Sequence, residues 1–166
     1  VQTCALPISN NGGYYGNAGV IKGDGSVRIW GDNTYGQLGN GTVNDSSSPI
    51  GITFNNATST VVKVVGAGTR FFTTFAFLFS DGTVETTGYA GIGARGNGST
   101  AANNSPTEVL CVDNIVDLQA YGFGNVTGFV ALNDKGNEYL WGYSTTYYIA
   151  GNVVGVNRLV PTLIQF

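Results

Sequence analysis

The sequence contains no histidine, seven lysine and arginine residues and two cysteines in 166 residues. Without histidine, Ser-His-Asp and Cys-His nucleophilic schemes and histidine-based metal sites are excluded for this chain. Nucleic-acid binders displace counterions with clustered Lys and Arg, and the seven basic residues here are scattered. We therefore expect no catalytic residues, no metal, no cofactor and no nucleic-acid partner.

Charged residues are also scarce, at 10% of the chain, against roughly 25% in typical soluble domains. No apolar stretch approaches the ~18 residues that span a bilayer, so no membrane span is expected. Glycine is abundant, with 26 residues, and Asn, Thr and Ser accompany it. All four rank poorly as helix formers, so the composition favours short strands joined by tight turns.

Residues 1–9 are set apart from the rest. They resemble the translation of a short-read sequencing adapter and lack the basic and apolar regions of a signal peptide. We expect them to be an artefact rather than native structure, and the chain to be a fragment. Cys4 then drops out, and Cys111, which follows an apolar pair, is expected to be a small core residue.

Internal repeats are the main signal. Residues 19–31, 76–88 and 130–142 align as an apolar strand, a tight turn and a second strand that ends in glycine. The turn glycines and the strand-ending glycines are each spaced 57 and 54 residues, and the prolines 57 and 55. The residues that define the repeat are Gly25, Gly31, Gly36, Gly39, Pro49, Gly82, Gly88, Gly93, Pro106, Gly136, Gly142 and Pro161.

Further strands complete each repeat. Residues 60–65 and 114–118 precede the second and third hairpins, and a weaker strand is expected after each proline, as at 106–110. Both phases of residues 75–79 are apolar, which indicates a sheet that is covered on both faces. We predict an all-β, incomplete β-propeller of about three antiparallel four-stranded blades, the first of them partial, with repeats at roughly 10–59, 60–113 and 114–166.

One segment carries a family resemblance. Residues 31–42 read GDNTYGQLGNGT, which resembles the signature of the regulator of chromosome condensation repeat. The second repeat keeps the glycines but loses Gln-Leu, and the third keeps little beyond Trp141-Gly142 and Pro161. The resemblance covers about residues 12–166 and implies part of a seven-bladed propeller that works by protein–protein contact.

Several local patterns have structural interpretations. Residues 91–96 satisfy G-x-G-x-x-G but align with the loop at 36–39, so no phosphate site is expected. No pair of carboxylates stands out for glycoside cleavage. Trp30 and Trp141 occupy matching repeat positions and are expected to pack between blades.

Loop tyrosines are the candidate partner contacts, because they combine large area with few rotors. Tyr35, Tyr89 and Tyr143 are spaced 54 residues apart, which is typical of an architectural role. The candidates are Tyr35, Tyr143, Tyr147 and Tyr148.

The sequence therefore predicts a non-catalytic binding or scaffold propeller that holds a protein partner through a rim of loops. The alternatives are an extracellular or phage virion module that recognises a receptor, a guanine-nucleotide exchange factor and a glycan-cleaving enzyme. A glycan partner stays open, the isolated chain is expected to self-associate, and the low charge favours an extracellular or virion setting.

Overall fold

The computed structural model describes residues 16–68, 72–122, 127–144 and 156–164, and these residues form strands and no helix. The strands are β1 (Asn17–Ile21), β2 (Val27–Gly31), β3 (Ser46–Gly51), β4 (Val61–Ala67), β5 (Thr74–Phe79), β6 (Val84–Gly88), β7 (Thr107–Glu108), β8 (Ile115–Tyr121), β9 (Gly128–Asn133), β10 (Glu138–Ser144) and β11 (Val156–Leu163).

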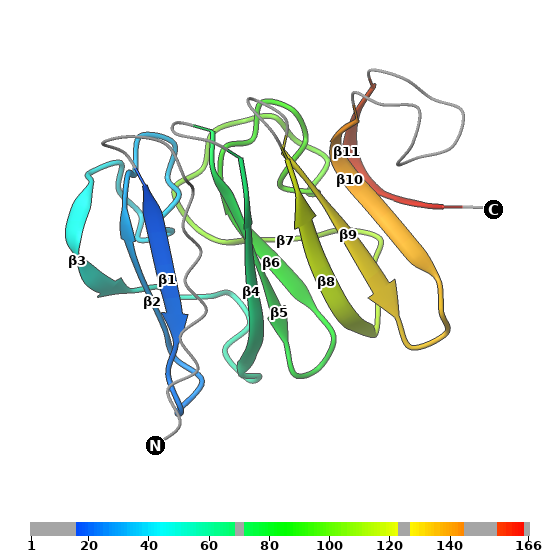
Figure 1. The fold of residues 1–166 in the computed structure, drawn as a ribbon, viewed down its shortest axis with the longest axis horizontal. Helices are drawn as coiled ribbons and strands as arrows, with labels where there is room; N and C mark the ends of the chain where they lie inside the picture. The colour runs from blue at the N-terminus through cyan, green and yellow to red at the C-terminus, as the bar shows by residue number, and fades with distance from the viewer. Residues whose placement is uncertain (1–15, 69–71, 123–126, 145–155, 165–166) are drawn as a thin grey trace.

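The strands make three antiparallel sheets that stand side by side in chain order (Figure 1). The first sheet has the order β1-β2-β3, the second β4-β5-β6-β7 and the third β8-β9-β10-β11. Their neighbouring edges β1, β4 and β8 contact one another in turn, so β3, β7 and β11 lie on the far side. This up-and-down order, repeated by adjacent sheets, is the architecture of propeller blades.

Each predicted hairpin is present. The turns between β1 and β2, β5 and β6, and β9 and β10 lie along one edge of the molecule, the lower edge in Figure 1. Gly25, Gly82 and Gly136 occupy the turns with φ of 78°, 83° and 81°. A side chain at these angles would crowd the following carbonyl, so the turn requires glycine.

The second sheet is buried on both faces, as the two apolar phases of β5 predict. Phe75, Phe77 and Phe79 pack toward the first sheet in a cluster that includes Ile29 and Leu38. Each buried phenylalanine contributes about 1.5–3 kcal/mol relative to an exposed one. The covering first sheet is therefore part of what holds the second in place.

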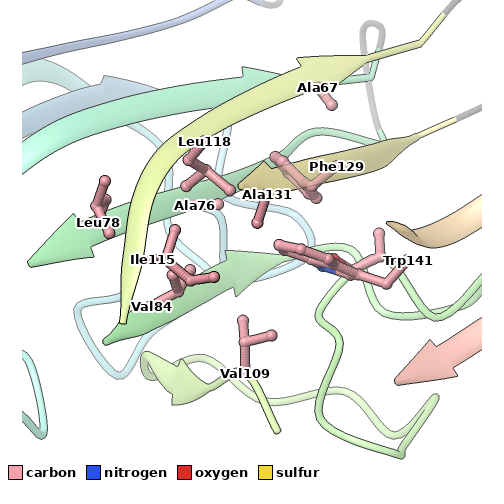
Figure 2. Close-up of a cluster of buried hydrophobic side chains, with 11 residues drawn as sticks. Ala67, Ala76, Leu78, Val84, Val109, Ile115, Leu118, Phe129, Ala131 and Trp141 are labelled. Atoms are coloured by element: carbon pink, nitrogen blue, oxygen red, sulfur yellow. The ribbon is translucent and has the colours of Figure 1, made fainter. Parts of the chain in front are cut away.

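The opposite phase of β5 faces the third sheet (Figure 2). Ala76 and Leu78 share a cluster with Leu118, Phe129 and Trp141. The Phe129 ring stacks on the Trp141 indole with centroids 5.5 Å apart. The small Ala76 leaves room for this aromatic pair, which is the alternation of small and large side chains that lets packed sheets interdigitate.

The same hydrogen bonds recur at the two junctions between sheets. The amide of Gly41 donates to the carbonyl of Asn104 at 2.9 Å, and the amide of Gly98 donates to that of Leu159 at 2.8 Å. Each acceptor precedes a repeat proline by two residues. Hydrogen bonds between sheets therefore recur along the chain together with the residues of the repeat.

Side chains extend this correspondence. The Thr87 hydroxyl donates to the carbonyl of Gln37 at 2.8 Å, and the Trp141 indole donates to that of Ala94 at 3.0 Å. Thr87 and Trp141 hold the same repeat position, as do Gln37 and Ala94. Both bonds are buried, so each fixes the next sheet against the loop of the one before.

The expected position of the fourth strand is wrong in two sheets. Only β7 follows its proline, Pro106, whereas Pro49 lies inside β3 and Pro161 inside β11. Both are edge strands, where a proline nitrogen need not donate to a neighbouring strand. The strand therefore begins several residues earlier than the proline suggests.

Candidate functional site

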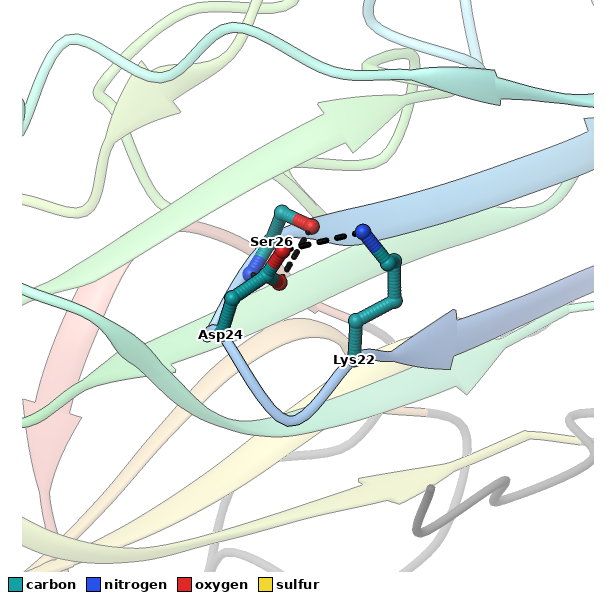
Figure 3. A network of polar contacts seen from close by, with 3 residues as sticks. All are labelled: Lys22, Asp24 and Ser26. Carbon is teal, nitrogen blue, oxygen red and sulfur yellow. Dashed lines mark hydrogen bonds and ion pairs between the residues drawn. The ribbon is translucent and has the colours of Figure 1, made fainter. Parts of the chain in front are cut away.

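The hairpin edge is organised by aspartates that serve the turns. In the first turn the Asp24 carboxylate accepts bonds from the Ser26 hydroxyl at 2.6 Å and amide at 3.0 Å, and pairs with Lys22 at 2.9 Å (Figure 3). These contacts, from Ser26 first and then Lys22, hold the pKa of Asp24 well below its ordinary value. The carboxylate is engaged in local structure.

In the second turn Asp81 fastens the linker that joins the first two sheets. Its carboxylate accepts bonds from the hydroxyls of Ser59 at 2.7 Å and Thr83 at 2.7 Å, and from the Asn56 amide at 2.9 Å. Ser59 and then Thr83 are the main causes that hold the pKa of Asp81 below its ordinary value. The linker thereby lies against the hairpin.

A buried carboxylate completes this attachment. Glu85, 2% exposed, accepts bonds from the backbone amides of Asn55 at 3.1 Å and Asn56 at 2.6 Å. A hollow of about 290 Å³ beside it is lined by Asn55, Asn56, Thr58, Asp81, Thr83, Glu85 and Glu108. Most polar groups that line this hollow bond to each other, and these hydrogen bonds stabilise the linker. Within the described residues no group of three His, Cys, Asp or Glu is placed to hold a metal.

The opposite ends of the strands carry the loops that follow β2 and β6. We call residues 32–45 the first motif loop. Asn33 is fully buried there, and its side-chain amide donates to the carbonyls of Thr42 and Asn44, both at 3.0 Å. Its side-chain oxygen accepts a bond from the Leu38 amide at 2.9 Å, and Leu38 enters the core. One asparagine therefore closes the loop.

We call residues 89–106 the second motif loop, which contains the G-x-G-x-x-G sequence. No helix follows it, in agreement with a structural role. Arg95, 0% exposed, takes the place of Leu38 and donates to the carbonyls of Asn103 at 2.9 Å and Ser105 at 2.8 Å, and to the Thr107 hydroxyl. Burial lowers its pKa. Sequence reasoning missed Arg95, and the only signal was a charge at a position where the first repeat has leucine.

Three aromatic rings meet where the first two sheets adjoin on this loop edge. Tyr35, Phe72 and Tyr89 are each half-buried. The ring centroids of Tyr35 and Tyr89 are 5.1 Å apart, those of Tyr35 and Phe72 5.6 Å, and those of Phe72 and Tyr89 4.6 Å. We call these three side chains the aromatic cluster.

The 54-residue spacing of the tyrosines does not place all three at one position of the repeat. Tyr35 lies four residues beyond Gly31, whereas Tyr89 lies one residue beyond Gly88 and Tyr143 one beyond Gly142. Tyr35 is not at the equivalent position, and it contacts Tyr89 of the next sheet instead.

Of the other predicted contact residues, Tyr143 is half-buried and its amide donates to the carbonyl of Thr127 at 3.0 Å. Tyr147 and Tyr148 lie outside the described residues. Next to Tyr143, the hydroxyl of Tyr121 donates to the carbonyls of Trp141 and Tyr143, both at 3.3 Å, and burial raises the pKa of Tyr121 to about 12. The assignment of Tyr35, Tyr143, Tyr147 and Tyr148 to partner contact stays a prediction.

One further expectation needs correction. Cys111 is exposed and has a φ of 60°, so it is a turn residue and not a core residue. Trp141 packs between the second and third sheets as expected. For Trp30, packing between blades stays a prediction: it is half-buried beside Ile29, which faces the second sheet. Since successive side chains in a strand point to opposite faces, Trp30 lies on the face away from that junction.

All the repeat-defining glycines have positive φ, including the three in the motif loops: Gly36 at 73°, Gly39 at 57° and Gly93 at 76°. Gly96, at the position equivalent to Gly39, also has a positive φ, of 65°. The part of the chain that the structure describes contains no helix long and apolar enough to cross a membrane.

The comparison with protein families agrees with this geometry. The model described as "Regulator of chromosome condensation (RCC1) repeat" matches residues 24–73, which run from the first hairpin turn to the start of β5. The chain contains an RCC1 repeat. The match includes the first motif loop and two residues of the aromatic cluster, Tyr35 and Phe72.

Solved structures extend the RCC1 likeness to the fold of the whole chain. Human WBSCR16 superimposes with a TM-score of 0.73 at 22% identity, over 99% of this chain and 37% of that one. Prp20p from Saccharomyces cerevisiae gives 0.73 at 20% identity, over 93% and 37%. Yeast RCC1 (Prp20) bound to Kap60 gives 0.72 at 19% identity, over 93% and 36%. The fold is that of an RCC1 propeller, and the chain spans little more than a third of the length of these structures.

Proposed function

We propose that this chain is a non-catalytic propeller segment that binds a protein partner through its loop edge, with the aromatic cluster as the centre of contact. The observation that carries the proposal is the gathering of Tyr35, Phe72 and Tyr89, half-exposed, from three loops of two sheets. Loops held by a rigid scaffold are where binding residues concentrate.

The chemistry of the cluster suits a protein surface. Phenylalanine and tyrosine rings offer large contact area at a small loss of side-chain entropy, and tyrosine is enriched among energetically dominant contact residues. Within the described residues, the hydroxyls of Tyr35 and Tyr89 have no hydrogen-bond partner, which leaves them free for a partner's polar groups. The rings brace one another, so they are ordered before binding.

The carboxylates of the hairpin edge offer less. Asp24, Asp81 and Glu85 are engaged by the chain's own donors.

The structural neighbours support a binding role, since the Prp20p structure was reported with its binding properties to Gsp1p and histones, and Kap60 was seen bound to yeast RCC1. The low charge and the abundance of Asn, Gly and Thr support an extracellular or virion setting as part of this proposal.

Photo-crosslinking tests the proposal. A benzophenone amino acid at Tyr35 or Tyr89 of the full chain is expected to capture a defined protein, identified by mass spectrometry, whereas the same group at Thr58 on the hairpin edge does not. The purified partner should then bind Tyr35→Ser/Tyr89→Ser at least tenfold more weakly than the parent, about 1.4 kcal/mol. Equal capture from both edges, or unchanged affinity of a folded double variant, contradicts the proposal.

A further inference from the structure

A second hollow, separate from the aromatic cluster, lies at the first junction beside the outer strands β3 and β7. It has a volume of about 370 Å³ and is open to solvent. Its lining contains no titratable side chain, which sets it apart from the acidic hollow around Glu85. It is formed by Gly39, Asn40, Gly41, Gly51, Thr53, Phe54, Asn55, Ser105 and Pro106.

Four polar groups in this lining have no hydrogen-bond partner within the described residues. They are the hydroxyls of Thr53 and Ser105, the amide nitrogen of Asn40 and the side-chain oxygen of Asn55. Hydroxyls donate and accept, an amide nitrogen donates and an amide oxygen accepts. The set therefore offers both kinds of group without charge.

An aromatic ring completes the lining. Phe54 is half-buried and is held by edge-to-face contacts with Phe77 at 4.8 Å and Phe79 at 5.2 Å between centroids. These contacts fix its orientation, because both partners are core residues of β5. The hollow thus combines one packed aromatic ring with several neutral donors and acceptors, a more polar lining than most small-molecule sites have.

The second junction shows that the fold does not require this chemistry. At the equivalent repeat positions, Leu110 replaces Thr53, Val112 replaces Asn55 and Val160 replaces Ser105. A Cβ on Gly98 would meet Val160 at 3.7 Å and Leu110 at 3.8 Å, whereas one on Gly41 would meet nothing within 4 Å. At the second junction apolar side chains approach the space beside Gly98. At the first junction the equivalent space beside Gly41 is polar and open.

We propose that this hollow binds one ring of a neutral saccharide. Sugar hydroxyls both donate and accept, so they match the uncommitted groups of Asn40, Thr53 and Ser105, and the apolar C–H face of a sugar ring matches Phe54. The lining itself carries no charge, and the Arg28 guanidinium, which lies against Gly51, is not part of it. The small volume of the hollow and its single aromatic ring favour one sugar ring over an extended peptide.

Saturation-transfer NMR on the full chain tests this assignment. The probes are the methyl glycosides of glucose, galactose, mannose and N-acetylglucosamine at millimolar concentration, with the peptide Gly-Asn-Ser-Gly as a comparison. At least one glycoside is expected to receive saturation, and the peptide is not. No transfer to any glycoside, or equal transfer to the peptide, overturns the proposal.

Variants locate the binding. Thr53→Leu/Ser105→Val installs the second junction's side chains, and it should weaken the best glycoside at least tenfold while the unfolding transition is kept. Thr162→Val, on the exposed edge strand β11, is the control and should bind as the parent does. Unchanged affinity in the folded double variant places the sugar elsewhere and overturns the assignment. Neither outcome bears on the aromatic cluster, because Tyr35, Phe72 and Tyr89 do not line the hollow.

Discussion

The first motif loop is closed from its beginning by Asn33, and the second is closed from its middle by Arg95. Asn33 reaches the carbonyls of Thr42 and Asn44, both at 3.0 Å. Arg95 reaches the carbonyls of Asn103 and Ser105, at 2.9 and 2.8 Å. Both satisfy loop carbonyls with a buried donor, but the donors come from different points of the repeat.

The two loops exchange a polar and an apolar residue between two equivalent positions. Where the first loop has Asn33 the second has Ala90, and where the first has Leu38 the second has Arg95. The first loop therefore takes its apolar contact and its polar closure from two residues, whereas the second uses the arginine for both. The stem of Arg95 is buried and its two terminal nitrogens are bonded, while its Nε has no partner within the described residues. The backbone positions that need positive φ are kept in both.

The two motif loops show what the repeat signature encodes. Its glycines specify a path for the chain, and its Asn and Leu specify one of at least two ways to hold that path. A repeat that has lost the side chains of the signature can therefore keep the loop, provided that a new buried donor holds it. The new donor bonds other carbonyls, because Asn103 and Ser105 correspond to Ser46 and Ser48 of the first repeat and not to Thr42 and Asn44.

Replacing Arg95 by leucine, the residue of the first loop, has the largest expected effect. Arg95→Leu removes the donors to Asn103 and Ser105 and should lower the free energy of unfolding by about 3 kcal/mol. Urea denaturation measures the change. Arg28→Leu, half-exposed on β2, is the matched control and should stay within about 0.5 kcal/mol.

The double variant Arg95→Leu/Ala90→Asn tests whether the closure of the first loop can replace that of the second. It gives the second loop both residues of the first, so we expect it to recover about 1 kcal/mol of the loss, the contribution of a typical hydrogen bond. A double variant no more stable than Arg95→Leu would mean that the two closures are not interchangeable.

Asn33→Ala should have a smaller effect, about 2 kcal/mol. Thr42 and Asn44 are exposed, so water can reach part of the carbonyls that lose their donor. Hydrogen exchange of the Leu38 amide should accelerate at least tenfold, because its acceptor is the Asn33 side chain. Asn97→Ala, which removes a bond to one loop amide at 3.2 Å, is the control. An unchanged Leu38 exchange rate contradicts this account of the first loop.

The strands and their stacking could be predicted because the information is local. The two apolar phases of residues 75–79 lie within one short segment, as does each turn glycine with its hairpin, and the turn glycines recur at spacings of 57 and 54 residues. They predicted a sheet covered on both faces, and β5 is wholly buried. The prolines were less informative, since an edge strand tolerates Pro49 and Pro161 within its length.

The contacts of the loops could not be predicted, because they depend on partners far along the chain. Arg95 is buried only because residues 103–107 fold back over it. Tyr35 meets Tyr89 across a junction, although its spacing suggested an equivalent position. The polar hollow at Thr53 and Ser105 becomes visible only when both junctions are superimposed in space.

Alanine at Gly41 and Gly98 should have the smallest effect and examines the backbone alone. Their φ angles are 79° and 76°, and a Cβ meets nothing closer than 3.7 Å at either. Each substitution should therefore lower the free energy of unfolding by about 1 kcal/mol, the penalty of a left-handed conformation. Gly36→Ala and Gly93→Ala should lose more, because a Cβ there comes within 2.8 Å of Asn104 and 2.7 Å of Arg158. If Gly41→Ala and Gly98→Ala differed by more than about 1 kcal/mol, the loops would share their glycines without sharing a backbone path, and the comparison between Asn33 and Arg95 would lose its common frame.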